Sequence, residues 1–308
     1  MPIKIPLTLP ATEILENENI FIMDESRAKS QDIRPLKIAI LNLMPTKIIT
    51  ETQILRLLSN TPLQIDITFL ATATYESKNT PHEHLTTFYK TFDEIKLQKF
   101  DGLIITGAPV ECLDFSEVSY WDELCEIIDW AKINVFSTLY VCWGAFAGLY
   151  YNRGIKKYPI SHKISGVFSH HTLIPSHPLV RGFDEYFDAP HSRFSYVLQD
   201  DILNDKGLDL LAVSGDAGVY LVASKDAREV YVTGHPEYDA YTLKDEYFRD
   251  LAKNAHPPIP KNYFPDDNPK NEPKNTWRSH AHLLYSNWLN YFVYQITPFN
   301  IDEIGKNL

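Results

Sequence analysis

Apolar runs of strand length alternate with helical patterns along most of this chain, and this alternation limits its fold more than any other feature. Several of the runs are continuously apolar, as strands covered on both faces are. The sequence therefore predicts an α/β fold built on a doubly wound, mostly parallel sheet. The strand-like runs occupy 37–44, 63–70, 101–107, 134–142, 208–214 and 228–234, and the helical patterns occupy 46–60, 84–100 and 120–133.

The rest of the chain lacks this regularity. Residues 155–227 read as irregular and short-stranded, and we expect them to form one wall of a binding cleft. Residues 256–275 are rich in proline and have no period, which predicts an extended surface loop. The amphipathic pattern at 277–296 predicts a helix that packs on the body. We expect one domain over 1–308 with its core in 35–300, because a chain of this length can bury one large core.

Composition narrows the class of partner. The formal net charge of -11 argues against nonspecific binding to nucleic acid, which needs a basic surface to displace counterions. No apolar stretch approaches the ~20 residues needed to cross a bilayer, so no membrane partner is expected. The three cysteines, Cys112, Cys125 and Cys142, cannot all pair, and the N-terminus lacks a secretory signal pattern. These features favour a cytoplasmic protein.

One cysteine stands at the end of a predicted strand, where parallel sheets bind their ligands. Cys142 closes the run 134–142, and small residues such as Gly144 follow where a helix would begin. A helix N-terminus favours the thiolate through its free amides and its dipole. The next amide, that of Trp143, would then face an oxyanion formed on the carbonyl under attack. The alternative is a buried structural cysteine, the commoner role of a lone cysteine in an apolar run.

A histidine and a glutamate follow the last predicted strand directly. His235 and Glu237 are two residues apart, so in an extended or turn segment both project to the same side, and the carboxylate can orient the imidazole. Taken alone, this pair could be an ordinary surface turn. With Cys142 at the end of another strand of the same sheet, the three residues form a candidate Cys-His-Glu triad.

Two enzyme families share this arrangement. The order strand, cysteine, turn and helix, followed later by GHPE, resembles the class I glutamine amidotransferases, whose sheet is flavodoxin-like. Those enzymes carry a glutamine four residues after the nucleophile, where this chain has Phe146, so a glutaminase is not expected. Nearly end to end, the chain resembles the homoserine O-acyltransferases that share this fold. The strings that carry this resemblance are ILNLMPTKIITETQILRLL, ITGAPVE, YVCWGAFAGLYY, FSHH, PHSR and GHPEYD.

The resemblance implies acyl transfer to L-homoserine in methionine biosynthesis. Cys142 would carry the acyl group as a thioester, His235 would be the general base and Glu237 would orient it. The reaction would be ping-pong, with an acyl-CoA as co-substrate and without a metal or another cofactor. In the family a glutamate at position 111 accompanies acetyl-CoA and a glycine accompanies succinyl-CoA, so Glu111 favours acetyl-CoA. If its carboxylate faces the acyl pocket, it would also repel the distal carboxylate of a succinyl group.

The resemblance further implies that Lys163, Ser192 and Arg249 hold the substrate. Arg249 could clamp an α-carboxylate through its planar fork, with Lys163 as a point charge for the same anion. The alternative for Arg249 is a surface ion pair with Asp245, four residues earlier on a predicted helix, and Ser192 could instead cap a helix. Lys47 also follows a strand end and is a further candidate for contact with substrate or CoA.

Other functions stay open on the sequence alone. The same fold could use succinyl-CoA, could hydrolyse its acyl group, or could be a non-catalytic binding module related to the amidotransferases. The intact Cys142, His235 and Glu237 argue against the binding module. The aromatic C-terminal helix indicates core packing or a homodimer contact rather than a cofactor site.

Overall fold

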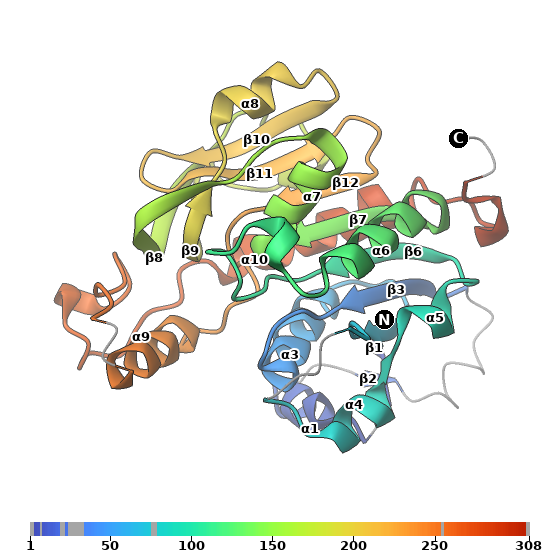
Figure 1. Ribbon diagram of the computed structural model, residues 1–308, viewed down its shortest axis with the longest axis horizontal. Helices are drawn as coiled ribbons and strands as arrows, with labels where there is room; N and C mark the ends of the chain where they lie inside the picture. Colours follow the sequence, from blue (N-terminus) through green and yellow to red (C-terminus); the bar gives the residue numbers. More distant parts are fainter. Residues whose placement is uncertain are drawn as a thin grey trace.

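The computed structural model describes residues 3–6, 8–18, 22–23, 34–74, 79–253 and 256–305. Within these residues a single mixed sheet of twelve strands runs through the molecule (Figure 1). The predicted α/β fold with a mostly parallel, doubly wound sheet is confirmed. The parallel strands follow the order β2 (Ile22–Met23), β1 (Ile3–Lys4), β4 (Ile65–Leu70), β3 (Leu36–Leu41), β6 (Phe100–Ile105), β7 (Val135–Val141) and β12 (Glu229–Val232), with β5 (Tyr89–Lys90) beside β4. The antiparallel strands continue as β11 (Gly218–Ser224), β10 (Leu208–Ser214), β8 (Tyr158–Thr172) and β9 (Tyr186–Tyr196).

Helices cover both faces of the parallel strands. Alternate residues of β3 enter different cores, since Ile38 and Ile40 pack with α3 and α10 while Ala39 and Leu41 pack with α6 and α7. This two-sided burial explains the continuously apolar runs. The helices are α1 (Pro10–Asn17), α3 (Lys47–Leu58), α4 (His82–Phe88), α5 (Phe92–Ile95), α6 (Trp121–Asn134), α7 (Trp143–Arg153), α8 (Gln199–Asn204), α9 (Thr242–Ala252) and α10 (Arg278–Asn287).

The pattern at 84–100, predicted to be one helix, instead forms α4, β5 and α5. Two interactions break the helix. Tyr89 pairs with Phe69 of β4, and its hydroxyl donates to the fully buried carboxylate of Glu51 at 2.6 Å. Thr91 and Glu94 then form a capping box that starts α5. Contacts with distant residues therefore override a local helical period.

The segment 155–227 is more regular than predicted. It contains the fifteen-residue strand β8 and the eleven-residue strand β9, paired antiparallel, and also β11, which pairs with both β10 and β12. Several positions of β8 are exposed and polar, so this strand lacks the apolar run by which the others can be recognised.

The proline-rich segment forms a loop whose one helical element is the short 3-10 turn Pro265–Asp267. Other 3-10 turns lie at Phe115–Glu117, Pro178–Val180 and Ile301–Glu303. The loop is anchored to the body, because Tyr263 and Phe264 pack in a small buried cluster with Trp277. The predicted C-terminal helix is present as α10 and continues as a π-helical segment, Trp288–Tyr294.

The N-terminal residues join the same core. β1 pairs with β4, and Ala11 and Leu15 of α1 are buried in the cluster that contains α3 and α10. No helix in the described part of the chain is long and apolar enough to cross a membrane.

Trp288 should be a principal anchor of the fold. Its side chain is fully buried, its indole donates to Ser137 Oγ at 3.1 Å, and its ring lies directly against Gly102 of β6. We expect Trp288→Ala to lower the free energy of unfolding by about 3–5 kcal/mol, since it leaves a large cavity under the sheet. Urea unfolding measures this loss. Phe299→Ala is the control, because that side chain is 84% exposed, and an equal loss in both variants would contradict the assignment.

Candidate active site

Cys142 lies at the junction between β7 and α7, in a backbone conformation that L-residues rarely adopt. Its φ is 50° and its ψ is -115°. Hydrogen bonds hold it on both sides: its amide donates to the Val232 carbonyl of β12 at 2.7 Å, and its carbonyl accepts from Ala145 at 2.9 Å and from Phe146 at 3.3 Å. The residue is 2% exposed. Strained turns of this kind, between a strand and a helix, place a side chain at the carboxyl end of a parallel sheet.

The turn leaves no room for a side chain at Gly144, two residues after Cys142. A Cβ on Gly144 would lie 2.7 Å from the Thr106 carbonyl oxygen and 2.8 Å from that of Ile105. Both are backbone atoms of the adjacent β6 segment and cannot move aside cheaply. The small residue predicted after the cysteine is therefore required by the close approach of α7 to β6.

His235 and Glu237 are joined as the sequence predicted. Nδ1 of His235 lies 2.6 Å from Oε1 of Glu237, and both side chains are buried. The His235 amide donates to the Pro190 carbonyl of β9 at 2.8 Å, and its ring stacks on Tyr238 with centroids 4.1 Å apart. The imidazole is therefore fixed on its carboxylate side, on its backbone and on one ring face.

The structure brings Cys142 and His235 together, 93 positions apart in the sequence, over Gly107 at the end of β6. A Cβ on Gly107 would touch both residues, 3.2 Å from Cys142 Cβ and 3.3 Å from His235 Cε1. The side chain of Cys142 also hydrogen-bonds to His235. Burial by itself lowers the pKa of His235, but the negative charges of Cys142 and Glu237 outweigh it and raise that pKa well above its usual value. The surroundings thus stabilise the imidazolium form of His235 next to the Cys142 side chain.

Trp143 is the first residue of α7, so its amide precedes the hydrogen bonds of that helix, which begin with the donors Ala145 and Phe146. The amide belongs to the positive end of the helix and adjoins the nucleophile. This is the position of an oxyanion donor.

A carboxylate that the sequence analysis did not single out organises the substrate-binding candidates. Glu246 of α9 accepts from Ser192 Oγ at 2.5 Å and from the Tyr238 hydroxyl at 2.7 Å, and it lies 3.4 Å from Lys163 Nζ. Burial opposes ionisation of Glu246, yet Lys163, Ser192 and Tyr238 together lower its pKa. Glu246 and Asp250 are four residues apart on α9, and both contact Lys163. This spacing of two acidic residues is the one feature of the sequence that could have indicated the cluster.

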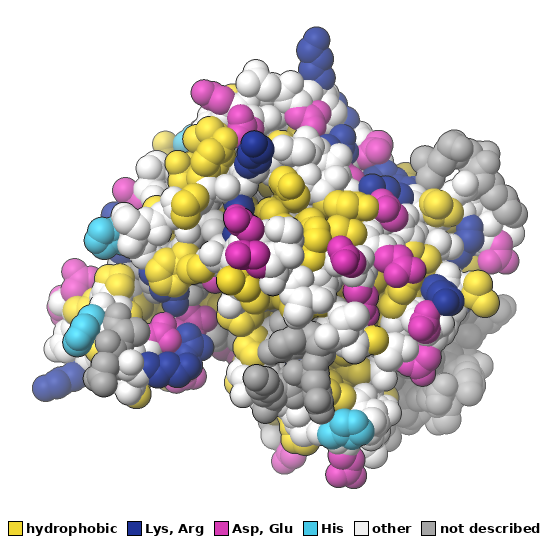
Figure 2. Space-filling view, in the orientation of Figure 1, with side chains coloured by type: hydrophobic (Ala, Val, Ile, Leu, Met, Phe, Trp, Pro, Cys, Tyr) yellow, Lys and Arg dark blue, Asp and Glu magenta, His cyan; other side chains and the backbone are white. Residues whose placement is uncertain are grey.

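Arg249 joins this cluster through Asp250. Its guanidinium donates twice to Asp250, at 2.9 and 2.8 Å, and its side chain is 52% exposed. The alternative ion pair with Asp245 is not formed in the described structure. Ser192 lies within β9 and hydrogen-bonds across to α9, so it does not cap a helix. Acidic and basic side chains lie next to one another over α9 in Figure 2.

Glu111 lies in the turn that follows β6, close enough to the site for the charges of His235, Lys163 and Glu246 to act on it. Burial raises the pKa of its carboxyl, while its own backbone and the two cations oppose this shift. The carbonyl of Glu111 accepts from Lys157 at 2.5 Å and from Ser195 at 3.3 Å, which holds the turn against β9. The side chain is thus partly removed from water and near the triad.

Comparison with known proteins identifies the family. The sequence model of the homoserine O-succinyltransferase family matches residues 2–299. The chain belongs to this family. It is 60% identical to a protein named homoserine O-acetyltransferase from Acetivibrio thermocellus, over 99% of this chain and 100% of that one. Proteins of the same name from Petrotoga mobilis and Bacteroides fragilis are 60% and 56% identical, and in both cases 99% of this chain is matched, with 99% and 100% of theirs.

Solved structures support the fold alone. A glutamine amidotransferase from Thermotoga maritima superposes with a TM-score of 0.56 at 11% identity, covering 85% of this chain and 100% of that one. Another, from Methylobacillus flagellatus, gives a TM-score of 0.51 at 11% identity, covering 84% and 95%. The class I glutamine amidotransferase-like fold expected from the sequence is therefore confirmed.

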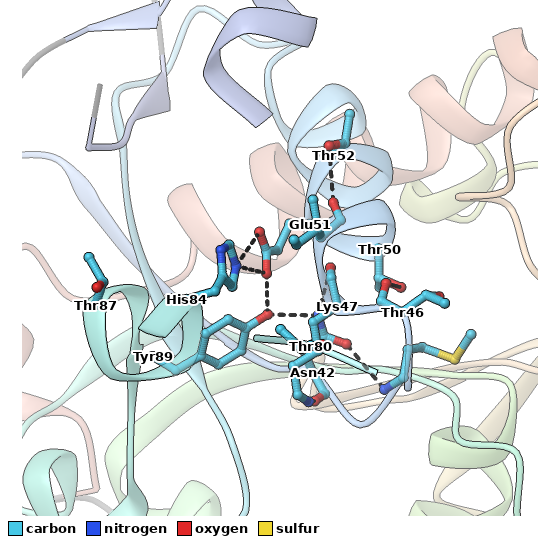
Figure 3. A network of polar contacts seen from close by, with 12 residues as sticks. Asn42, Thr46, Lys47, Thr50, Glu51, Thr52, Thr80, His84, Thr87 and Tyr89 are labelled. Carbon is cyan, nitrogen blue, oxygen red and sulfur yellow. Dashed lines mark hydrogen bonds and ion pairs between the residues drawn. The ribbon is translucent and has the colours of Figure 1, made fainter. Parts of the chain in front are cut away.

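Lys47, a substrate candidate from the sequence, belongs to a separate buried network in the structure (Figure 3). Its ammonium donates to the carbonyl of Asn42 and lies 5.5 Å from the ring centroid of Tyr89. Glu51, one helical turn further on, accepts from Tyr89 and contacts His84 at 2.9 Å. Burial lowers the pKa of Lys47 to about 8, against the attraction of Glu51. The network ties the start of α3 to β3, α4 and β5.

The described residues contain no group of three or more His, Cys, Asp or Glu side chains arranged to hold a metal ion. Cys112 is exposed, Cys125 is partly buried, and both are free thiols.

Lys47 should make stability depend on pH. Its pKa of about 8 lies below the ordinary lysine value of 10.5, so the unfolded chain binds more protons between these values and the free energy of unfolding rises with pH there. We expect Lys47→Met to remove this rise, on the order of 3 kcal/mol over the full window. Urea unfolding at several pH values measures the difference between the variant and the parent. Lys96→Met, at an exposed ion pair, is the control, and parallel curves for Lys47→Met and the parent would refute the assignment.

Proposed function

We propose that this protein is a homoserine O-acetyltransferase that moves an acetyl group from acetyl-CoA to the hydroxyl of L-homoserine through a thioester on Cys142. The observation that carries the proposal is the junction of a thiol at a helix N-terminus with the His235–Glu237 pair. Membership of the family supports homoserine as the acyl acceptor, and the names of the most similar relatives support acetyl as the acyl group.

In the first half-reaction the Cys142 thiolate attacks the carbonyl carbon of the acetyl thioester. The tetrahedral oxyanion receives hydrogen bonds from the Trp143 amide and from an amide of the 107–111 loop. Collapse of this intermediate breaks the bond to the CoA sulfur, and the His235 imidazolium gives its proton to that leaving group. The acetyl group stays on Cys142 as a thioester of nearly equal energy, and His235 is left neutral.

In the second half-reaction the neutral His235 accepts the proton of the homoserine hydroxyl as its oxygen attacks the acetyl carbon. Glu237 holds the ring through Nδ1 and stabilises the imidazolium that forms. The same donors hold the oxyanion, and its collapse releases O-acetylhomoserine and restores the thiolate beside the imidazolium. The ring stacked on Tyr238 need not move between the two steps.

The cluster around Glu246 suits the charged ends of an amino acid. A homoserine zwitterion needs an anion for its ammonium group and a cation for its carboxylate. Glu246 is the partly buried anion, and Lys163 and Arg249 are the cations at the same site. Ser192 donates to the Glu246 carboxylate and so holds it in position. No cofactor is needed in this scheme, since acetyl-CoA and homoserine supply all the reacting groups.

Two alternatives remain distinct from this proposal. The name of the family refers to succinyl transfer, which Glu111 disfavours because a second carboxylate would meet it in a partly dehydrated pocket. A hydrolase would use water in the second step and would turn over without homoserine.

A homodimer is also expected from the aromatic C-terminal segment, although Trp277 and Trp288 themselves are buried within the chain.

The acyl-enzyme gives the direct test. We expect acetyl-CoA alone to leave one acetyl group on Cys142, detected by peptide mass spectrometry, and homoserine to remove it. Cys142→Ala should remain unlabelled, while Cys125→Ala, the matched control at a cysteine on α6, should be labelled as the parent is. Rapid loss of the label in water without homoserine would favour the hydrolase, and absence of any label would sink the proposal.

The choice of acyl donor is tested at Glu111. We expect Glu111→Gly to raise kcat/KM for succinyl-CoA at least tenfold relative to acetyl-CoA, since the like charge is gone and this gain corresponds to about 1.4 kcal/mol. Competition between the two thioesters measures the ratio. Cys112→Gly, at the exposed next residue, is the control for a change of backbone alone. An unchanged ratio in Glu111→Gly would mean that the carboxylate does not select the donor.

A further inference from the structure

One charged side chain close to the nucleophile has no role in the scheme above. Arg193 follows Ser192 in β9 and is 1% exposed. Its guanidinium has neutral partners: Nε donates to Nδ1 of His191 at 3.1 Å, and the two terminal nitrogens donate to the carbonyls of Ser195 and Ala217. In the described part of the chain no carboxylate pairs with it. A buried cation without a counter-anion is expensive, so its retention at this place calls for a physical reason.

The surroundings of Arg193 are the walls of the active site. Its guanidinium carbon lies 6.0 Å from the ring centroid of Phe146, one helical turn after Cys142 on α7. The neighbouring residues of β9 contact the other parts of the site, since the Pro190 carbonyl accepts from the His235 amide and Ser195 Oγ donates to the Glu111 carbonyl. Burial lowers the pKa of Arg193 to about 10, and the negative charges that oppose this are those of Cys142 and Glu111. Arg193 therefore stays cationic near neutral pH.

We propose that Arg193 is a positioning residue for charge: a fixed buried cation that stabilises the negative charge of Cys142 without touching the substrate. Its carbonyl partners hold the guanidinium in place but leave its charge uncompensated, so the field acts on the thiolate and on the oxyanion formed at the same point. In a site of low dielectric such a field is stronger than in water.

The inference rests on the proposed role of Cys142 as nucleophile, and alkylation of Cys142 by iodoacetamide tests it without either substrate. The rate of alkylation follows the thiolate, so its pH profile reports the apparent pKa of the cysteine. We expect Arg193→Gln and Arg193→Met to raise that apparent pKa by about one unit or more, which slows alkylation about tenfold on the acid side of the profile. Arg193→Lys keeps the charge and should return most of the parent profile.

Arg153→Gln is the matched control. Arg153 is another arginine close to α7, but it lies at the end of that helix opposite to Cys142 and is paired with Glu229 at 2.9 Å, so its loss should leave the alkylation profile unchanged. Circular dichroism and urea unfolding establish that each variant is folded. A neutral variant that folds and keeps the parent profile would overturn the inference. If neither neutral variant folds, Arg193→Lys decides: a profile shifted by a full unit despite the retained charge would overturn it too.

The two proposals fail in different ways. A parent enzyme whose Cys142 titrates as an ordinary thiol, or does not react, contradicts the proposed nucleophile itself. A parent enzyme with a thiolate at low pH and no response to loss of Arg193 contradicts only the role of the arginine.

Discussion

The structure depends on one strained turn. Cys142 can hold its positive φ only because hydrogen bonds to β12 and to the first turn of α7 fix it from both sides. Those bonds in turn require that the first turn of α7 packs directly on β6. Little space is left there, because a Cβ on Gly144 or on Gly107 would come too close to its neighbours. The same packing brings His235 to the thiol. Strain at one residue is therefore the consequence of aligning three strand ends, β6, β7 and β12, at a single point.

Around this point the charges are arranged in layers. The innermost layer is Cys142, His235 and Glu237, in which the Glu237 carboxylate lies within hydrogen-bonding distance of the imidazole. Outside it lies the Glu246 cluster, where an anion is held by hydroxyls and by Lys163. The acidic surface implied by a net charge of -11 does not prevent binding of an anionic co-substrate, because the local cations and the amides of α7 face the site.

The sequence predicts what is set by local pattern. The strands β3, β4, β6, β7, β10 and β12 were recognised because two-sided burial makes each of them an apolar run. β8 and β9 are not predicted, because a half-exposed strand with serine, histidine and glycine has no apolar run. The pattern over α4 and α5 predicts a single helix, because the break between them depends on the hydrogen bond from Tyr89 to the distant Glu51. In the site, the spacing of His235 and Glu237 is a local feature, and the sequence predicts their pairing from it. The role of Glu246 cannot be predicted in this way, because its contacts with Lys163 and Ser192 form only when α9 lies against β8 and β9.

The strand β9 shows how one short segment can serve two layers of this site. Successive side chains of a strand point to opposite faces. Ser192 therefore reaches Glu246 of α9, while Arg193 packs on the other face beside Phe146 of α7. A shift of register by one residue would exchange these two environments, placing a hydroxyl beside Phe146 and a guanidinium beside Glu246. The long antiparallel pairing of β8 with β9 fixes that register, with Ser192 opposite Ser165 and Arg193 opposite Ile164. The part of the fold that is hardest to predict from the sequence thus holds Ser192 and the buried cation in register with Cys142.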